Sequence, residues 1–165
     1  KTQADTAVTW GAKESRSEVQ LLTDRILIRV EKANGAVQFL SRDGKKLLTE
    51  NPSEPRLLLD SQTWNFFAWD KNERLKSKGV LADDFMDLST KARYISFGQK
   101  KLRMPLVLSN KGYAIGVAAG STVLFCNVRI YGQYIYTQGT GQIDYYFIYN
   151  ENQERNIEQY RNLPV

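Results

Sequence analysis

The fold is decided by residues 91–163, which read KARYISFGQKKLRMPLVLSNKGYAIGVAAGSTVLFCNVRIYGQYIYTQGTGQIDYYFIYNENQERNIEQYRNL. Short runs of β-branched and aromatic residues alternate with glycine-rich breaks, and an aromatic run occupies residues 143–149. Turn signals at intervals of about 8–12 residues are typical of antiparallel sandwiches and barrels. No helical patterns alternate with these runs, so a parallel βαβ arrangement is not expected.

The end of this stretch, residues 151–163, predicts an amphipathic helix. Asn150 is the expected N-cap, and Gln153 follows three residues later as a capping-box partner. Pro164 disfavours continuation of the helix. A helix that closes a β domain in this way indicates a connector to a further element. The apolar residues that share one helix face are Ile157, Tyr160 and Leu163.

Toward the N-terminus, residues 25–32 alternate between apolar and polar side chains with the period of a strand. Asn34-Gly35 and Asp43-Gly44 follow, and both dipeptides suit tight hairpin turns because they tolerate positive φ. Residues 25–49 therefore predict a three-stranded meander. We expect an all-β chain with a leading arm or edge strand, an antiparallel β-sandwich and a C-terminal α-helix, at residues 1–17, 18–149 and 150–165 respectively.

Composition narrows the classes of function. The chain has 165 residues, 23 of them basic and 18 acidic, which gives a net charge of +5. Its basic residues are dispersed, with pairs as the longest runs, so no nucleic-acid footprint is expected. No apolar run approaches the roughly 20 residues of a membrane span. Because the first residue is Lys1 and not Met, we expect a processed or trimmed product.

The chain has no histidine and a single cysteine, Cys126, in an apolar run. Catalysis by Ser-His-Asp or Cys-His arrangements is therefore excluded, and no nitrogen- or sulfur-rich zinc site is possible. EF-hand, GxGxxG and Walker patterns are also absent. We predict no metal or cofactor, and we interpret Cys126 as a small core residue.

Two kinds of side chain remain as candidates for a site. The acids at residues 83–87 and Asp144 are interpreted as surface, turn or structural carboxylates, because neighbouring residues of a strand point to opposite faces. The aromatic stretch 62–69 splits its rings between two faces of a strand, one for the core and one for an interface or ligand platform. Its rings are Trp64, Phe66, Phe67 and Trp69.

Four segments, taken in order, resemble the N-terminal domain of glycoside hydrolase family 31. They are YISFGQ at 94–99, MPLVLSNKGY at 104–113, IDYYFIY at 143–149 and QYRNL at 159–163. The resemblance extends across residues 18–163 and implies a galactose-mutarotase-like β-sandwich that precedes a (β/α)8 barrel. That barrel would carry both catalytic carboxylates, so no catalytic residue is expected in this chain. The parent protein would hydrolyse α-glucosidic or α-xylosidic bonds with retention of configuration.

The resemblance also implies that the sandwich packs on the catalytic barrel of the same parent chain and shapes the rim of its pocket. The segment 98–105, which bears the rim loop in many relatives, is short here. The expected partners are that barrel and an oligosaccharide with α-linked sugars, without nucleic acid or membrane. The candidate rim residues are Gln99, Arg103, Trp69 and Asp70.

Two other functions are considered. An independent carbohydrate-binding module would need an exposed aromatic platform, for which Trp64 and Trp69 are the candidates. A mutarotase acting alone would need a general acid, and the absence of histidine removes its usual one.

Overall fold

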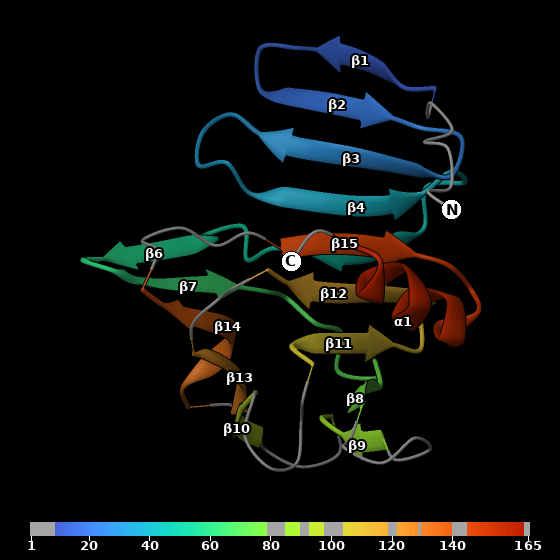
Figure 1. The fold of residues 1–165 in the computed structure, drawn as a ribbon. Coiled ribbons are helices and arrows are strands. Elements are labelled where there is room, and N and C mark those ends of the chain that lie inside the picture. Colours follow the sequence, from blue (N-terminus) through green and yellow to red (C-terminus); the bar gives the residue numbers. More distant parts are fainter. Residues whose placement is uncertain are drawn as a thin grey trace. The chain divides into compact units, whose positions relative to one another are not determined.

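The computed structural model describes residues 9–78, 85–89, 93–97, 104–118, 122–128, 130–139 and 145–163, and Figure 1 shows strands followed by a helix near the C-terminus. The chain forms two compact units, Lys1–Pro55 and Arg56–Val165. Every strand pairing between the described residues is antiparallel, so the expected all-β antiparallel fold is confirmed. Within the described part of the chain, no helix has the length and apolar character needed to span a membrane.

The first unit is a five-stranded meander in which each strand pairs with the next one along the chain. The expected three-stranded meander at 25–49 is confirmed, and two preceding strands extend it. Gly35 and Gly44 both have positive φ, 73° and 86°, as the predicted turns require. The strands are β1 (Gly11–Glu14), β2 (Glu18–Leu22), β3 (Ile26–Glu31), β4 (Val37–Ser41) and β5 (Lys46–Thr49).

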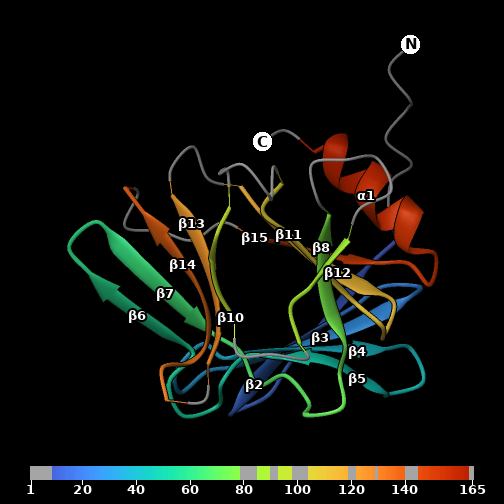
Figure 2. The same cartoon turned by 90° about the horizontal axis from the view of Figure 1, so that it is seen from below.

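The second unit contains two five-stranded sheets, which face one another in Figure 2. The first sheet has the order β10-β13-β14-β7-β6 and the second β15-β12-β11-β8-β9. The strands of the first sheet are β6 (Arg56–Leu59), β7 (Gln62–Phe66), β10 (Arg93–Ser96), β13 (Val123–Val128) and β14 (Gly132–Gln138). Those of the second are β8 (Leu75–Lys78), β9 (Phe85–Asp87), β11 (Leu106–Ser109), β12 (Tyr113–Val117) and β15 (Tyr145–Tyr149).

The core of the second unit lies between its two sheets. Phe125 and Ile135 of the first sheet and Val107 and Ile115 of the second are fully buried. Strands β11 and β12 are buried at every position, because their alternate residues face the other sheet and the helix. This arrangement is a β-sandwich with a helix on one outer face, as the sequence predicts.

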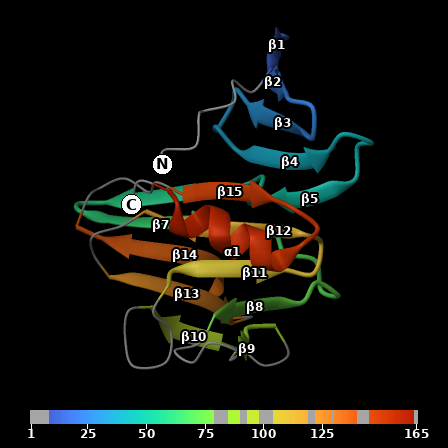
Figure 3. The same ribbon diagram turned by 45° about the vertical axis from the view of Figure 1, so that its right-hand side comes forward.

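Helix α1 (Gln153–Arg161) lies across β15, β12 and β11 (Figure 3). As predicted, Ile157 and Tyr160 are buried on this face, and Leu163 packs against the same cluster. The predicted N-cap is wrong by two residues. Asn152 caps the helix by accepting a hydrogen bond from the backbone N–H of Glu154, 2.9 Å away. The other members of the cluster are Leu106, Leu108, Ala114, Ile148, Met104 and Tyr146.

The aromatic strand β15 is covered on both faces. The family resemblance implies that this strand contacts the core with one face and the catalytic barrel with the other. Phe147 stacks on Tyr113 within the sandwich at a centroid distance of 5.4 Å, and Tyr146 and Ile148 belong to the cluster beneath α1. The chain's own helix therefore occupies much of the face that was assigned to the barrel.

Two strands of the second sheet, β8 and β9, were not predicted. Because residues 71–79 are polar, they predict a loop or turn, yet Leu75–Lys78 forms β8. Alternate residues of this strand are buried, and the hydroxyl of Ser77 donates to the Leu106 carbonyl at 2.7 Å. Ser77 can be buried because its hydroxyl is hydrogen-bonded, and a buried polar residue does not stand out in the sequence as a core position.

Candidate functional site

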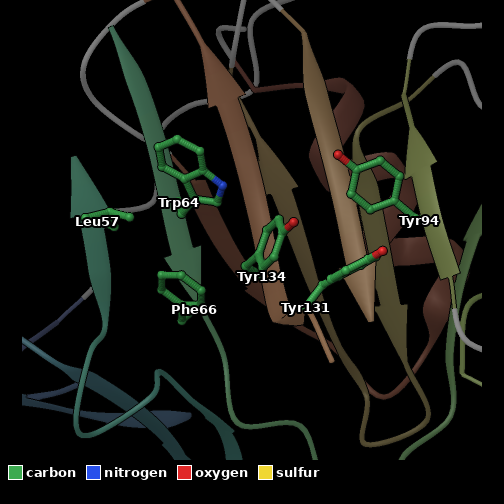
Figure 4. Close-up of a pocket in the computed structure, with 6 residues that line it drawn as sticks. All are labelled: Leu57, Trp64, Phe66, Tyr94, Tyr131 and Tyr134. Carbon is green, nitrogen blue, oxygen red and sulfur yellow. The ribbon is translucent and has the colours of Figure 1, made fainter. Parts of the chain in front are cut away.

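An aromatic groove is open on the outer face of the first sheet of the second unit (Figure 4). Its volume is about 680 Å³. Figure 4 shows Trp64 and Phe66 on one side, Tyr94 and Tyr131 on the other, and Tyr134 between them. The residues that line this groove are Leu57, Trp64, Phe66, Tyr94, Tyr131 and Tyr134.

The register of the sheet brings these side chains together in two rows. Directly opposed residues of an antiparallel pair point to the same face, so each row crosses the sheet on the groove side. The first row is Tyr94, Cys126, Tyr134 and Phe66, from β10, β13, β14 and β7. The second row is Ser96, Leu124, Tyr136, Trp64 and Leu57, and it ends on β6.

The rings of the groove support one another in pairs. Trp64 lies 5.0 Å from Tyr136 between ring centroids, and Phe66 lies 5.6 Å from Tyr134 in an edge-to-face arrangement. Tyr94 and Tyr131 form a looser edge-to-face pair at 6.5 Å. Such pairs hold aromatic side chains at defined angles and stabilise them by about 0.5–1.5 kcal/mol each. The walls of the groove are therefore ordered without a ligand.

Cys126 lies between Tyr94 and Tyr134 in the first row. It is fully buried, as predicted for a core residue, and its thiol contacts the Gly132 carbonyl with Sγ and O 3.5 Å apart. Because the Cys126 side chain is much smaller than the tyrosines on either side of it, a depression remains between the two rings. The contrast in size along the row explains why this face is hollowed.

The groove is neutral, because none of its six described lining residues carries a charge. Burial raises the pKa of the Tyr134 hydroxyl, and contact with the Cys126 thiol and the nearby Tyr94 and Tyr131 hydroxyls raises it further. The hydroxyl therefore stays protonated throughout the neutral range and can donate a hydrogen bond. Chemically, the groove offers apolar ring faces together with neutral hydroxyl groups.

Trp69, a predicted rim residue, is buried in the core. Its ring stacks on Phe67 at 5.1 Å and approaches Phe125 at 5.2 Å, and only 7% of the residue is exposed. The predicted division of the aromatic stretch is confirmed, because Phe67 and Trp69 belong to the core while Trp64 and Phe66 line the groove. Trp69 has little surface to offer a ligand.

Asp70, the next predicted rim residue, is exposed. Its carboxylate accepts a hydrogen bond from the backbone N–H of Asn72 at 2.8 Å, which shapes the turn that leads into β8. The other two predicted rim residues, Gln99 and Arg103, lie outside the described residues. Neither Trp69 nor Asp70 lines the aromatic groove.

The acids considered for catalysis show no catalytic arrangement where they are described. Asp87 accepts hydrogen bonds from the N–H and the hydroxyl of Ser89, at 2.8 and 3.0 Å, as an acid in a turn does. Asp83, Asp84 and Asp144 lie outside the described residues. In the part of the chain that is described, no group of three or more potential metal ligands comes together.

Glu73 is a buried carboxylate that the sequence did not single out. Glu73 accepts hydrogen bonds from the hydroxyls of Ser109, at 2.6 Å, and Tyr113, and it pairs with Lys111 Nζ at 2.9 Å. Burial and the charge of Glu73 together raise the pKa of Tyr113 well above its usual value. Every partner lies on or beside the β11–β12 hairpin, so this network fixes the start of β8 to that hairpin.

A scan of protein-family models and a search of the curated proteins both give no match to this chain. Solved structures do share its fold. The cycloalternan-forming enzyme of Listeria monocytogenes, solved with a pentasaccharide substrate, matches with a TM-score of 0.76 and 16% identity over 93% of this chain and 16% of that one.

Two enzymes of glycoside hydrolase family 31 match similarly. A dextranase of Flavobacterium johnsoniae, solved with isomaltotriose, has a TM-score of 0.75 and 18% identity over 92% of this chain and 20% of that one. An α-xylosidase from a soil metagenome, solved with xylose, has a TM-score of 0.69 and 19% identity over 96% of this chain and 27% of that one. The chain thus has a fold that occurs within family 31 enzymes, and it spans about a quarter of their length or less.

Proposed function

We propose that this chain is a non-catalytic β-sandwich domain of a family 31 glycoside hydrolase. The observation that carries the proposal is the fold match, which covers 92–96% of this chain but only 20–27% of the two family 31 enzymes. The ordered sequence segments between residues 94 and 163 point to the same family independently of the structure.

The side chains support a non-catalytic role. Retaining hydrolysis needs two carboxyl groups about 5–5.5 Å apart on either side of the scissile bond. None of the described residues that line the aromatic groove is a carboxylate, and the described acids Glu73 and Asp87 are engaged in a structural network and a turn. We assign both catalytic carboxylates to a barrel elsewhere in the parent chain.

The substrate class follows from the same relatives. They were solved with isomaltotriose, xylose and a pentasaccharide bound. We infer that the parent hydrolyses α-glucosidic or α-xylosidic bonds in oligosaccharides, with an α-glucosidase-like activity as the specific proposal. We expect the residues of the barrel to determine whether the parent prefers glucosides or xylosides.

We further propose that the turn at Asp70 contributes to the pocket rim, together with Gln99 and Arg103. The buried Trp69 ring and the Glu73 network hold this turn on the sandwich, while the Asp70 carboxylate is exposed. Trp69 would then position Asp70 without touching sugar itself.

The test uses aryl α-glucoside and aryl α-xyloside substrates with the 165-residue chain and with its full-length parent. We expect turnover by the parent and none by this chain. In the parent, Asp70→Asn preserves the turn but removes the charge, so it should raise KM without changing the fold. Turnover by the purified chain, or a parent inactive on both substrates, would overturn the proposed function.

A further inference from the structure

The aromatic groove is open to solvent on a face that no described element of its own unit covers. Tyr94 and Tyr131 are 60% and 61% exposed, and Leu57 is 42% exposed. A contiguous patch of exposed aromatic rings, unlike a single exposed ring such as Trp10, is typical of a binding surface. The second sheet of the same unit differs, because α1 covers its outer face.

The chemistry of the lining selects a neutral ligand that combines apolar faces with hydroxyl groups. Phe66 and Trp64 offer ring surface, and three tyrosines add hydroxyls that can donate or accept hydrogen bonds. A pyranose ring has this character, with C–H groups on its faces and hydroxyls around its edge. The volume of about 680 Å³ lies within the range of ligand sites, about 300–1,000 Å³.

We propose that this groove binds a neutral oligosaccharide, with its sugar rings stacked between the Tyr94–Tyr131 pair and the Trp64–Phe66 wall over Tyr134. The absence of charge among the described lining residues disfavours phosphorylated or acidic sugars as ligands. The separate walls across several strands suit a chain of sugars over a monosaccharide. This inference goes beyond the proposed function, because it assigns a ligand to the sandwich itself and holds whether or not the parent is a family 31 enzyme.

The groove differs from the simple platform of Trp64 and Trp69 that a carbohydrate-binding module was expected to need. Trp69 is in the core, and its place is taken by tyrosines from distant parts of the chain. Tyr94 comes from β10, and the register of the sheet brings it to the same face as Trp64. Tyr131 comes from the turn before β14 and lies beside Tyr94 in the groove.

The test is titration of this chain with maltotriose, isomaltotriose and cellotriose, followed by calorimetry and by NMR shifts of aromatic protons. We expect saturable binding of at least one trisaccharide, with the largest shifts at Tyr94, Tyr131 and Trp64. The double variant Tyr94→Ala/Tyr131→Ala removes one wall and should weaken binding by about tenfold or more. The doubly conservative variant Tyr94→Phe/Tyr131→Phe keeps the rings and should weaken binding less.

Trp10→Ala serves as the matched control, because Trp10 is an exposed aromatic residue, 66% accessible, in the other unit. It should leave the affinity unchanged. Absence of saturable binding by all three trisaccharides at millimolar concentration would overturn the inference, as would equal affinities in the wild type and the alanine double variant. Self-association in sedimentation experiments that the alanine double variant abolishes, without any sugar binding, would instead identify a protein interface and overturn it equally.

Parent activity separates the two proposals. Sugar binding by the groove with an inactive parent would refute only the family 31 function. An active parent whose sandwich binds no trisaccharide would refute only the groove.

Discussion

The ring of Tyr160 lies directly on Gly116, in the space that a Cβ at residue 116 would fill. The hydroxyl of Tyr160 continues past this contact and donates to the Val117 carbonyl at 3.0 Å. Helix α1 thus packs on β12 through the buried ring of Tyr160, and glycine at residue 116 leaves room for that ring. The contact sets how closely the helix approaches the sheet.

We predict that Gly116→Ala destabilises the chain by about 2 kcal/mol or more. A strand glycine replaced by alanine gains about 0.5–1 kcal/mol from the backbone, but overpacking costs about 1–3 kcal/mol and displacing a buried aromatic ring costs more. Urea unfolding would measure the loss, and hydrogen exchange should show that α1 opens first. Gly11→Ala is the control, because a Cβ at Gly11 meets no atom within 4 Å. Equal stabilities of the two variants would contradict this account.

The Glu73 network yields a second prediction. Glu73→Ala leaves the hydroxyls of Ser109 and Tyr113 without this acceptor and removes the carboxylate that pairs with Lys111. We expect the free energy of unfolding to fall by about 2–4 kcal/mol. This loss is smaller than the largest losses for fully buried ion pairs, because Lys111 can still reach water. Thermal unfolding would measure it, and Glu73→Gln should cost less because its carbonyl still accepts from both hydroxyls.

Glu158→Ala is the matched control for this loss, since Glu158 is an exposed glutamate within α1. Its removal should change the free energy of unfolding by less than about 0.5 kcal/mol. If both alanine variants unfolded at the same temperature, the network would have no stabilising role.

Stability should also fall at alkaline pH. The pKa of Tyr113 is raised well above 10.0, first by burial and then by Glu73, and burial also raises the pKa of Tyr160. Above the unfolded value the unfolded chain loses these protons while the folded chain keeps them, so the folded state loses relative stability. We expect a constant contribution below about pH 10 and a decline of up to about 1.4 kcal/mol per pH unit per tyrosine above it.

Urea unfolding of the wild type and Tyr113→Phe across this range would test the sign. The variant starts less stable, because Glu73 loses a donor, but its stability should decline less steeply above pH 10.0, the ordinary tyrosine value. Parallel curves for the two proteins would show that Tyr113 does not contribute to the alkaline decline.

Local patterns in the sequence predict much of this fold. The strand at residues 25–32, the turns at Gly35 and Gly44 and the apolar face of α1 depend only on neighbouring residues, and all three are present. The split of the aromatic stretch between core and surface is likewise a matter of strand period. These features need no knowledge of which strands pair.

The features that were missed depend on partners far away in the chain. Glu73 is buried because Tyr113, 40 residues later, donates to it, and β8 reads as a loop until its pairing with β11 is known. The groove needs the register that aligns Tyr94 with Tyr134 across β13, and a shift of one residue would turn these rings to the other face. The available signal was the number of tyrosines in and just before β14, at residues 131, 134 and 136.

The start of α1 gives a last prediction, because Asn150 and Asn152 are both candidates for its N-cap residue. Asn152 accepts from the N–H of Glu154, whereas the Asn150 side chain accepts from the N–H of Asn152 at 3.1 Å and only shapes the approach. Asn152→Ala should therefore cost about 1 kcal/mol, and Asn152→Asp should be tolerated because a negative charge is favourable at a helix N-terminus. Asn162→Ala, at the opposite end of α1, is the control, since the cap there uses the backbone N–H of residue 162 and not its side chain. Urea unfolding that ranks Asn162→Ala as the more damaging change would place the cap elsewhere.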